Sequence, residues 1–496
     1  MQLSKTKYCR GIQCKKILWL DTYKPEEATQ VNDDAVLENG TEVGELAKGL
    51  FGKYSDVAFS KELSQMIEKT KELLLNENIV ITEASFQFEN LFCSVDILKK
   101  AKNQIELYEV KSSTEIKDIY IHDISYQYYL LKKLGYSITK ASIVSINPFY
   151  ERKGELDLKK LFVIHDVTNI VEENREQVED NIRQMERYMK TEEIEDNIDM
   201  HCFKPYPCPY FSYCTKHLEK ENIFSLRRMP KKKLIKFYKE GITSFEQLKK
   251  ININDPYKRQ VLYELEEREP HIDVEKMNMF LSTLQEPLYF LDFETFQEAI
   301  PKYDYTRPYM QIPFQYSLHS VENGKLKHKE FLSKPNVDPR RELALRLVKD
   351  IPMNACVVAY NMMFEKMIVK HLSELYPDLR QHLLCIYENM HDLMIPFKEG
   401  YYYTKEMKGS YSIKYVLPAL FPDERDLDYH HLDMVHNGKE AMYLFKDMIN
   451  KEEREVEQIR KALLAYCKLD TYAMVKIWYK LKDLVDTKQK ETMEVP

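Results

Sequence analysis

Apolar and polar residues alternate along the first third of the chain in a way that predicts a mixed sheet with helices. From Thr41 to Phe51, apolar residues recur at the spacing of one helical face. Three strand-like runs, a helical run and a further strand-like run follow, in this order: 79–88, 91–98, 105–111, 122–134 and 138–146. Within 105–111 every second side chain shares one face, as in a strand. We therefore expect the order helix, three strands, helix, strand.

The rest of the chain divides into a helical middle and a second region in which strands precede helices. An amphipathic helix is expected over 171–190 and a small helical connector over 224–285. Further strands are expected at 288–291, 312–321, 325–332 and 355–360, and helices at 340–349, 362–373, 412–420, 439–450, 453–467 and 470–484. Strands first and helices later indicate a mixed sheet flanked by helices. The predicted class is α/β with mixed α+β sheets, in three parts: 1–218, 219–285 and 286–496.

Length and composition agree with this division. The chain of 496 residues allows roughly three domains at ~150 residues each. With 44% apolar and 12% aromatic residues it can bury real cores, which argues against disorder. It has no signal peptide, no apolar run of membrane-spanning length and no G-x-x-x-x-G-K-[ST] loop, so we expect a cytoplasmic protein without a membrane or ATP site. The net charge of −7 means that a grip on nucleic acid must come from local cations.

The first candidate site lies on the strand-like runs of the first part. Asp96 ends one run, and Glu109 and Lys111 share a face of the next. Two carboxylates at that spacing can hold Mg²⁺ or Mn²⁺, which activates water and stabilises phosphoryl charge. The lysine can orient or deprotonate the attacking water. A surface Glu–Lys pair is common on strands, so the tripeptide Glu109-Val110-Lys111 alone is a weak indication of a metal site.

The order of elements around these residues resembles the PD-(D/E)xK fold of RecB-like nucleases over residues 1–215. The resemblance implies one or two metal ions, a helix acid and a glutamine on the helix after the active-site strands. Here these are Glu42, with Glu45 as the alternative, and Gln127. Leu131 stands where the family often has tyrosine.

Cysteines suggest a cofactor at the end of this first part. Cys202, Cys208 and Cys214 are evenly spaced among prolines and aromatic residues, and Cys14 is the best fourth ligand, with Cys9 second. The arrangement resembles the iron–sulfur staple of CRISPR-associated and AddB-type RecB-like nucleases. That resemblance implies a [4Fe–4S] cluster on Cys14, Cys202, Cys208 and Cys214. Zn²⁺ is the alternative, because four thiolates suit either and histidines lie nearby.

The second candidate site lies in the last part. Asp292 and Glu294 end a buried strand on one face, and buried carboxylates there need a cation. Glu365 opens a helix after another strand, and Tyr466 precedes Asp470 by one helical turn. Two metal ions about 4 Å apart can be bridged by such carboxylates.

Over residues 286–485 these motifs resemble the DnaQ-type DEDD exonucleases, which have an RNase H-like fold. The resemblance implies a two-metal site of Asp292, Glu294, Glu365 and Asp470, with Tyr466 positioning the nucleophilic water. Glu365 departs from the family, which has aspartate there, and Asp392 is an additional or substitute metal ligand.

Both halves together resemble an uncharacterised bacterial family that joins a RecB-like nuclease to a DnaQ-like exonuclease. The implied function is a metal-dependent DNA nuclease for end processing, repair or defence, with 3′–5′ exonuclease activity in the second half. Two alternatives stay open: a nucleic-acid-binding scaffold with degenerate sites, and an exonuclease that acts on RNA. A basic stretch at 227–239, interleaved with Phe224, Phe237 and Tyr238, and a turn at 241–244 could bind the strand. Protein partners are unknown.

Overall fold

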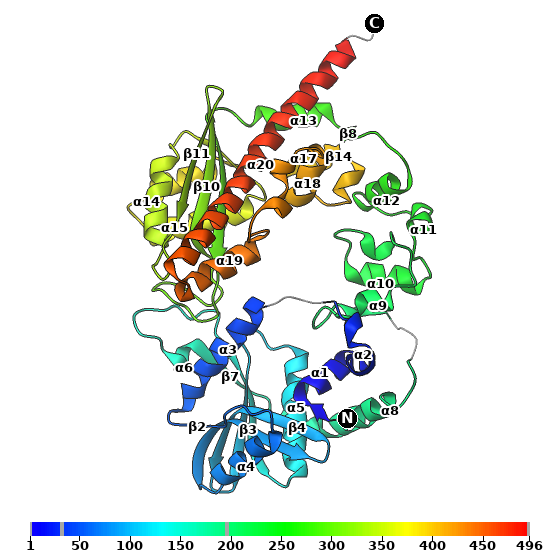
Figure 1. Ribbon diagram of the computed structural model, residues 1–496, viewed down its shortest axis with the longest axis vertical. Helices are drawn as coiled ribbons and strands as arrows, with labels where there is room; N and C mark the ends of the chain where they lie inside the picture. The colour runs from blue at the N-terminus through cyan, green and yellow to red at the C-terminus, as the bar shows by residue number, and fades with distance from the viewer. Residues whose placement is uncertain (1, 30–33, 194–197, 494–496) are drawn as a thin grey trace. The chain divides into compact units, whose positions relative to one another are not determined.

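The computed structural model describes residues 2–29, 34–193 and 198–493, which form two units (Figure 1). The first unit comprises Met1–Glu219, Lys231–Lys239 and Glu298–Met310. The second comprises Lys220–Pro230, Glu240–Gln297 and Gln311–Pro496. The connector predicted over 219–285 is therefore not a separate body. In addition, the loop Glu298–Met310 returns to the first unit, which a boundary near 286 did not anticipate.

The first unit is built on a seven-stranded sheet in the order β2-β3-β4-β5-β6-β7, with β1 paired to β4. The strands are β1 (Leu3–Ser4), β2 (Ser55–Asp56), β3 (Asn78–Phe88), β4 (Leu91–Ala101), β5 (Gln104–Val110), β6 (Ser137–Ile146) and β7 (Phe162–Asp166). The pairs β3–β4 and β4–β5 are antiparallel, while β5–β6 is parallel. Helix α5 (Asp118–Lys133) provides the crossover that a parallel pair requires.

Apolar faces of helices cover this sheet. The main helices are α1 (Lys5–Gln13), α2 (Lys15–Tyr23), α3 (Asp34–Lys48), α4 (Leu63–Leu73), α5 and α8 (Arg175–Tyr188). One core cluster joins α1, α2, α5 and α8 to the strands, and a smaller one packs Val43 of α3 against Ile97 and Tyr108. The loop Glu298–Met310 completes this unit: Arg152 Nη1 donates to the carbonyls of Pro301 and Lys302 at 2.9 and 3.0 Å.

The second unit holds a five-stranded sheet in the order β11-β10-β9-β12-β13. Its strands are β9 (Leu288–Phe296), β10 (Ile312–Glu322), β11 (Lys325–Leu332), β12 (Cys356–Ala359) and β13 (Met390–Asp392). β9 is antiparallel to β10 and parallel to β12. The sheet is thus mixed, as predicted, and its helices are α14 (Arg340–Asp350), α15 (Met363–Leu375), α16 (Arg380–Glu388), α18 (Ile413–Leu420), α19 (Gly438–Asp447) and α20 (Glu453–Met493).

One helix differs from expectation. Residues 453–484, predicted as two helices, belong to the single helix α20, which runs past β9 and β10 in Figure 1. No proline or glycine interrupts the chain there, so nothing breaks the backbone hydrogen bonds. The connector is helical as expected, with α10 (Lys231–Lys239), α11 (Phe245–Lys249), α12 (Tyr257–Leu265) and α13 (Val274–Ser282). Within the described ranges, no helix combines the length and the apolarity that crossing a bilayer requires.

Candidate metal sites and a cysteine pocket

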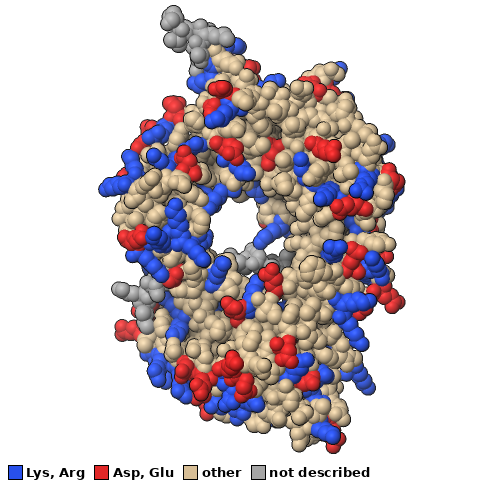
Figure 2. All heavy atoms as spheres, turned by 180° about the vertical axis from the view of Figure 1, so that it is seen from behind, with Lys and Arg blue, Asp and Glu red and all other residues tan. Residues whose placement is uncertain are grey.

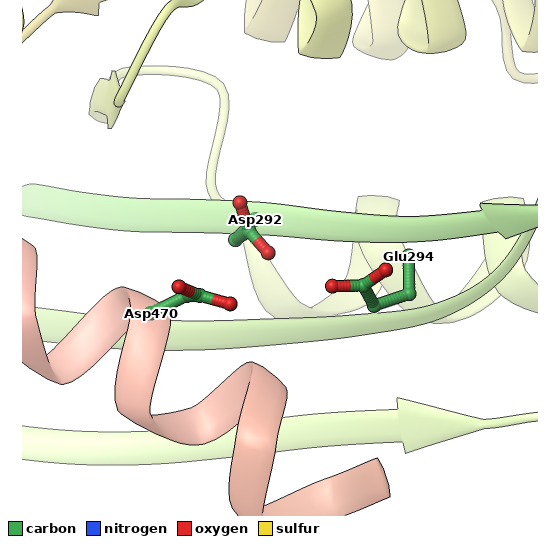
Figure 3. A group of neighbouring side chains, drawn as sticks. All are labelled: Asp292, Glu294 and Asp470. Atoms are coloured by element: carbon green, nitrogen blue, oxygen red, sulfur yellow. The ribbon is translucent and has the colours of Figure 1, made fainter. Parts of the chain in front are cut away.

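Three carboxylates of the second unit converge (Figure 3). Oxygens of Asp292, Glu294 and Asp470 all lie within 4.8 Å of one another. Asp292 and Glu294 share one face of β9 because strand side chains alternate, and Asp470 reaches them from α20. Glu294 and Asp470 are only 7% and 9% exposed. Residues far apart in sequence therefore form one nearly buried acidic cluster.

Glu365 is a fourth acid close enough to influence this cluster through its charge, although it is outside the group of oxygens within 4.8 Å. It lies in the first turn of α15, is 3% exposed, and burial raises the pKa of its carboxyl to about 8. Its charge also helps to raise the pKa of Asp292 and Glu294. Among the described residues, its Oε2 atom has no hydrogen-bond partner. An acceptor that is buried without a donor is costly, and a cation would satisfy it.

Asp392, expected as an additional ligand, has another task in the structure. Its Oδ1 atom accepts backbone N–H groups of Asn361 at 2.9 Å and Met394 at 3.0 Å. Asn361 has a positive φ of 69°, a conformation that needs such support. Asp392 thus holds the turn before Glu365 through Oδ1, and its charge also helps to raise the pKa of Glu365. Its role as an additional metal ligand stays a prediction.

The four acids repel one another strongly. Burial, followed by the charges of the neighbouring carboxylates, raises the pKa of Asp292 and Glu294 well above the ordinary values. Burial raises the pKa of Asp470 to about 6. Throughout the described chain, no lysine or arginine forms an ion pair with any of the four acids. A cluster of this kind is stabilised by divalent cations.

Two tyrosines border Asp470. Tyr466 lies one turn before it on α20, as predicted, and its hydroxyl lowers the pKa of Asp470. Tyr429, which the sequence did not single out, donates its hydroxyl to Asp470 Oδ1 at 2.6 Å. The two rings lie 6.0 Å apart at 58°. Tyr429 is in the short 3₁₀ helix Tyr429–His431, where no spacing relates it to the motif, so no sequence signal could have found it.

One lysine influences the cluster from a distance. Lys414, in α18, donates to the carbonyl of His436 at 2.8 Å. Its charge lowers the pKa of Glu294 and of Asp470. The start of α18 thus brings one cation near the acids.

In the first unit, the predicted residues also meet. Lys111 Nζ lies 2.6 Å from Glu109 Oε1 and 2.6 Å from Asp123 Oδ2. Asp96 Oδ2 accepts the backbone N–H of Val110 at 2.7 Å, which holds its carboxylate beside Glu109. The end of β5 and the middle of β4 therefore form one site.

Helix α5 contributes two side chains from one face. Gln127 Nε2 donates to Glu109 Oε2 at 2.7 Å and to Asp123 Oδ1 at 3.0 Å. Gln127 is therefore at the site, as predicted, while Leu131, one turn later, is fully buried in the core. Asp123 was not predicted, although its position four residues before Gln127 on the same helical face was an available signal.

A third acid comes from a strand and not from the expected helix. Glu42, on α3, has an exposed side chain, and Glu45 pairs with Lys48 at 2.7 Å. Glu83, in contrast, lies opposite Asp96, between the pairs Thr82–Ile97 and Ala84–Val95. Burial and then the charge of Asp96 raise the pKa of Glu83 to about 7. Glu83 is therefore a further candidate for the third acid, although Glu83, Asp96 and Glu109 do not bring ligand oxygens within 4.8 Å of one another. The assignment of Glu42 stays a prediction.

The N-terminal helix supplies a second lysine that sequence reasoning missed. Lys5 Nζ lies 2.9 Å from Asp96 Oδ1 and 3.1 Å from both oxygens of Glu109. Burial alone would raise the pKa of Glu109, but Lys111 and Lys5 outweigh it and the pKa is lowered. Burial and the charge of Glu109 raise the pKa of Asp123 to about 6. A lone lysine near the N-terminus carries no motif that could have revealed this contact.

The four predicted cysteines line one cavity of about 340 Å³, together with His201. Cys14 lies between α1 and α2, and Gln13 Nε2 donates to the carbonyls of His201 and Tyr206 at 2.8 Å each, which ties the N-terminus to the cysteine segment. Cys9 points elsewhere, since its thiol contacts the carbonyl of Ile119 at 3.9 Å. All nine cysteines lie in the described ranges, and none forms a disulfide.

The spacing of these thiols bears on the cofactor. Zn–S bonds of ~2.3 Å place the sulfurs of a zinc tetrahedron about 3.8 Å apart. In the described chain, the one set of three ligand atoms within 4.8 Å of one another is the Asp292 cluster. Among the described residues, no three of these sulfurs therefore lie within 4.8 Å of one another around the cavity.

The basic stretch is only partly available for a ligand. Lys231, Lys232 and Lys236 are exposed, but Phe237 is buried and cannot stack on a base. Ser244, in the turn expected to grip a strand, caps α11 by accepting the N–H of Gln247 at 3.3 Å. On the face drawn in Figure 2, basic and acidic side chains are interspersed.

Comparisons with known proteins match a part of the chain that lies mostly in the second unit. Residues 289–412 match a family model described as a domain of unknown function, DUF2779. Over 234 residues, covering 42% of this chain, the sequence is 27% identical to uncharacterized protein UU173 of Ureaplasma parvum serovar 3. The matched part covers 33% of that relative. No solved structure matches the chain.

Proposed function

We propose that the protein is a metal-dependent nucleic-acid phosphodiesterase with two sites: a DnaQ-like exonuclease site in the second unit and a PD-(D/E)xK-type site in the first. The observation that carries the proposal is the convergence of Asp292, Glu294 and Asp470 to within 4.8 Å without an ion pair from the described chain. Divalent cations bound there would activate water and stabilise phosphoryl charge. Nucleic acid is the matching substrate, because phosphodiesters bring the negative charge that such cations bind.

In the second site, the chain's own residues would position the metal ligands and the water. The Tyr429 hydroxyl fixes one oxygen of Asp470, leaving the other for a cation. Tyr466, on the same helix, is placed to orient the attacking water, the role that the resemblance gives it. Lys414 brings positive charge to the side of Glu294 and Asp470, where a substrate phosphate would enter. Positioning of this kind accounts for much of the rate enhancement in phosphoryl transfer.

In the first site, Asp96, Glu109 and Glu83 are the candidate ligands. Burial would lower the pKa of Lys111, but the charges of Glu109 and Asp123 hold it above its ordinary value. Lys111 Nζ lies 2.6 Å from an oxygen of each of these carboxylates. From this position Lys111 would orient the attacking water and stabilise charge on the phosphate.

The cysteine pocket fits an iron–sulfur cluster better than zinc. Four thiols surround a cavity of about 340 Å³ and are spread more widely than a zinc site. Thiolates are the usual ligands of such clusters. Cys14, Cys202, Cys208 and Cys214 would hold the group and pin the N-terminus to the end of the first unit. Iron and sulfide analysis of anaerobically purified protein tests this. Cys14→Ser should lose the iron, whereas Cys385→Ser should keep it.

The nuclease proposal is tested with 5′-labelled single- and double-stranded DNA in Mg²⁺ or Mn²⁺, with RNA of the same sequence as competitor. We expect a ladder of products shortened from the 3′ end, lost in Asp470→Asn. Asp486→Asn is the matched control, because Asp486 is an exposed acid on the same helix. Full activity in the double variant Lys111→Ala, Asp292→Ala would refute a nuclease. A preference for RNA would change the proposed substrate, while metal-dependent phosphodiester hydrolysis would remain the proposed reaction.

A further inference from the structure

We propose that the ammonium group of Lys5 occupies the cation position of the first site, so that Lys5 and a divalent metal ion compete for the same carboxylates. This inference rests on the proposed metal site of the first unit. Lys5 Nζ bonds Asp96 Oδ1 and both oxygens of Glu109 at 2.9–3.1 Å. A metal ion bridging Asp96 and Glu109 would need these same atoms.

The other contacts of the two carboxylates leave no second place for a cation between them. Asp96 Oδ2 is held by the backbone N–H of Val110. The oxygens of Glu109 are also bonded from the other side, by Lys111 and by Gln127. Lys5 Nζ is the cation that contacts both carboxylates at once. A metal ion that takes the same oxygens therefore requires the Lys5 side chain to leave.

Because the backbone around Lys5 is held in place, only the Lys5 side chain can move away from the two carboxylates. Leu3 pairs with Leu91 at the start of β4, the strand that carries Asp96, and the Leu3 carbonyl accepts the Tyr126 hydroxyl at 2.5 Å. Three residues after Lys5, the fully buried Tyr8 stacks on Tyr126 with ring centroids 4.8 Å apart. The flexible four-carbon stem of a lysine can swing away while its backbone stays in place.

Helix α1 also connects this contact to the cysteine pocket. α1 begins at Lys5 and ends at Gln13, directly before Cys14. Its Gly11 is packed so closely that a Cβ atom would lie 2.7 Å from Leu18 Cδ1 and from Met185 Sδ. The helix is thus held at both ends, which sets how far Lys5 reaches into the site.

Competition between Lys5 and metal is measured as Mn²⁺ affinity by electron paramagnetic resonance. The full-length protein carries Asp292→Asn and Asp470→Asn, so that the second site is silenced, and Asp96→Asn identifies the first-site signal. In this background, Lys5→Met should tighten Mn²⁺ binding by about tenfold or more, because a charge-assisted contact no longer has to be broken. The control Lys7→Met removes the same charge from an exposed position of the same helix and should leave the affinity unchanged.

The outcomes separate the inference from the proposed function. If Mn²⁺ binds to the first site with equal or lower affinity in Lys5→Met, the competition is refuted and the metal site stands. If no Asp96-dependent Mn²⁺ signal appears in either protein, both the metal site and the competition are refuted. Thermal unfolding in EDTA adds a second readout: Lys5→Met should lower the Tm, and Mn²⁺ should restore it. A Tm that Mn²⁺ does not restore would also contradict the inference.

Discussion

In the first unit, Asp96 and Glu109 are bonded by Lys5, and Glu109 also by Lys111, whereas the four acids of the second unit have no ion pair with a lysine or arginine of the described chain. Both clusters are buried, so each needs positive charge. The first obtains it from its own side chains, whereas under the proposed function the second would obtain it from bound cations. The proposal therefore expects the first site to be stable without metal and the second to be stabilised by it.

The largest expected effect is on catalysis in the second unit. Asp470→Asn removes a carboxylate from the cluster, and we expect 3′-end degradation to fall by about a thousandfold, because the loss of metal-held charge stabilisation amounts to several kcal/mol. Initial rates on 5′-labelled DNA at saturating Mg²⁺ measure it. Asp486→Asn should retain the rate. An unchanged rate in Asp470→Asn would place catalysis elsewhere.

The second prediction concerns stability of the first unit. Glu109 is 1% exposed and bonds two lysines, so Glu109→Gln leaves Lys5 with Asp96 and Lys111 with Asp123 as their remaining carboxylates and should destabilise the protein by ~3 kcal/mol in EDTA. The control is Glu106→Gln on the same strand, where the pair with Lys99 is partly exposed and worth under ~1 kcal/mol. Urea unfolding gives both values, and equal losses would contradict the comparison.

Removing an acid from the second unit should increase the free energy of unfolding in EDTA, whereas removing Glu109 from the first unit should decrease it. Asp292→Asn relieves repulsion among buried carboxylates, so in EDTA the variant should be more stable than the natural protein by ~1 kcal/mol. Mg²⁺ should reverse the order, because only the natural cluster binds it fully. The same urea unfolding in EDTA and in Mg²⁺ checks both signs. A variant less stable than the natural protein in EDTA would show that the acids do not repel.

The repulsion among the buried acids of the second unit should also appear in the pH dependence of stability. A carboxyl whose pKa is raised by folding binds more protons when folded, so its contribution to stability is lost as pH rises. Burial raises the pKa of Glu365 from 4.5 to about 8 and the pKa of Asp470 from 3.8 to about 6. In EDTA, the difference in unfolding free energy between the natural protein and Glu365→Gln should therefore change between pH 4.5 and about 8. A flat difference would mean that Glu365 titrates normally.

The smallest effect is expected at Tyr429. Tyr429→Phe removes one hydrogen bond to Asp470 and should reduce the exonuclease rate by about tenfold or less, since such a bond to a charged group is worth ~1.5 kcal/mol. The control Tyr443→Phe alters an exposed tyrosine and should leave the rate unchanged. A loss as large as that of Asp470→Asn would make Tyr429 a direct participant.

The sequence predicted those site residues whose positions follow from a local pattern along one strand or helix. Alternation on the strands identified Asp96, Glu109, Asp292 and Glu294, because side chains two residues apart share a face. Residues that arrive from elsewhere without a motif escaped: Lys5, Glu83 and Tyr429 meet their partners only through long-range packing. Glu42 shows the converse, since a family pattern suggested it and the fold leaves it exposed.

The boundaries of helices and strands were likewise predictable where a local pattern marks them and not where long-range packing decides them. The longer strands of both sheets were expected, but the short strands Leu3–Ser4, Ser55–Asp56, Phe162–Asp166 and Met390–Asp392 were not, because two to five residues carry too little pattern. The continuity of α20 was not expected either. The loop Glu298–Met310 belongs to the first unit because Tyr309 donates its hydroxyl to the Ser112 carbonyl and Gly154 N bonds Asp304 at 2.7 Å. No sequence pattern announces such a return.

Anomalous diffraction from crystals soaked in Mn²⁺ tests the central claim most directly. We expect anomalous density between the carboxylates of Asp292, Glu294 and Asp470, and at lower Mn²⁺ concentration than at Asp96 and Glu109, where Lys5 competes. Density that fills the first site and leaves the second empty would contradict the account.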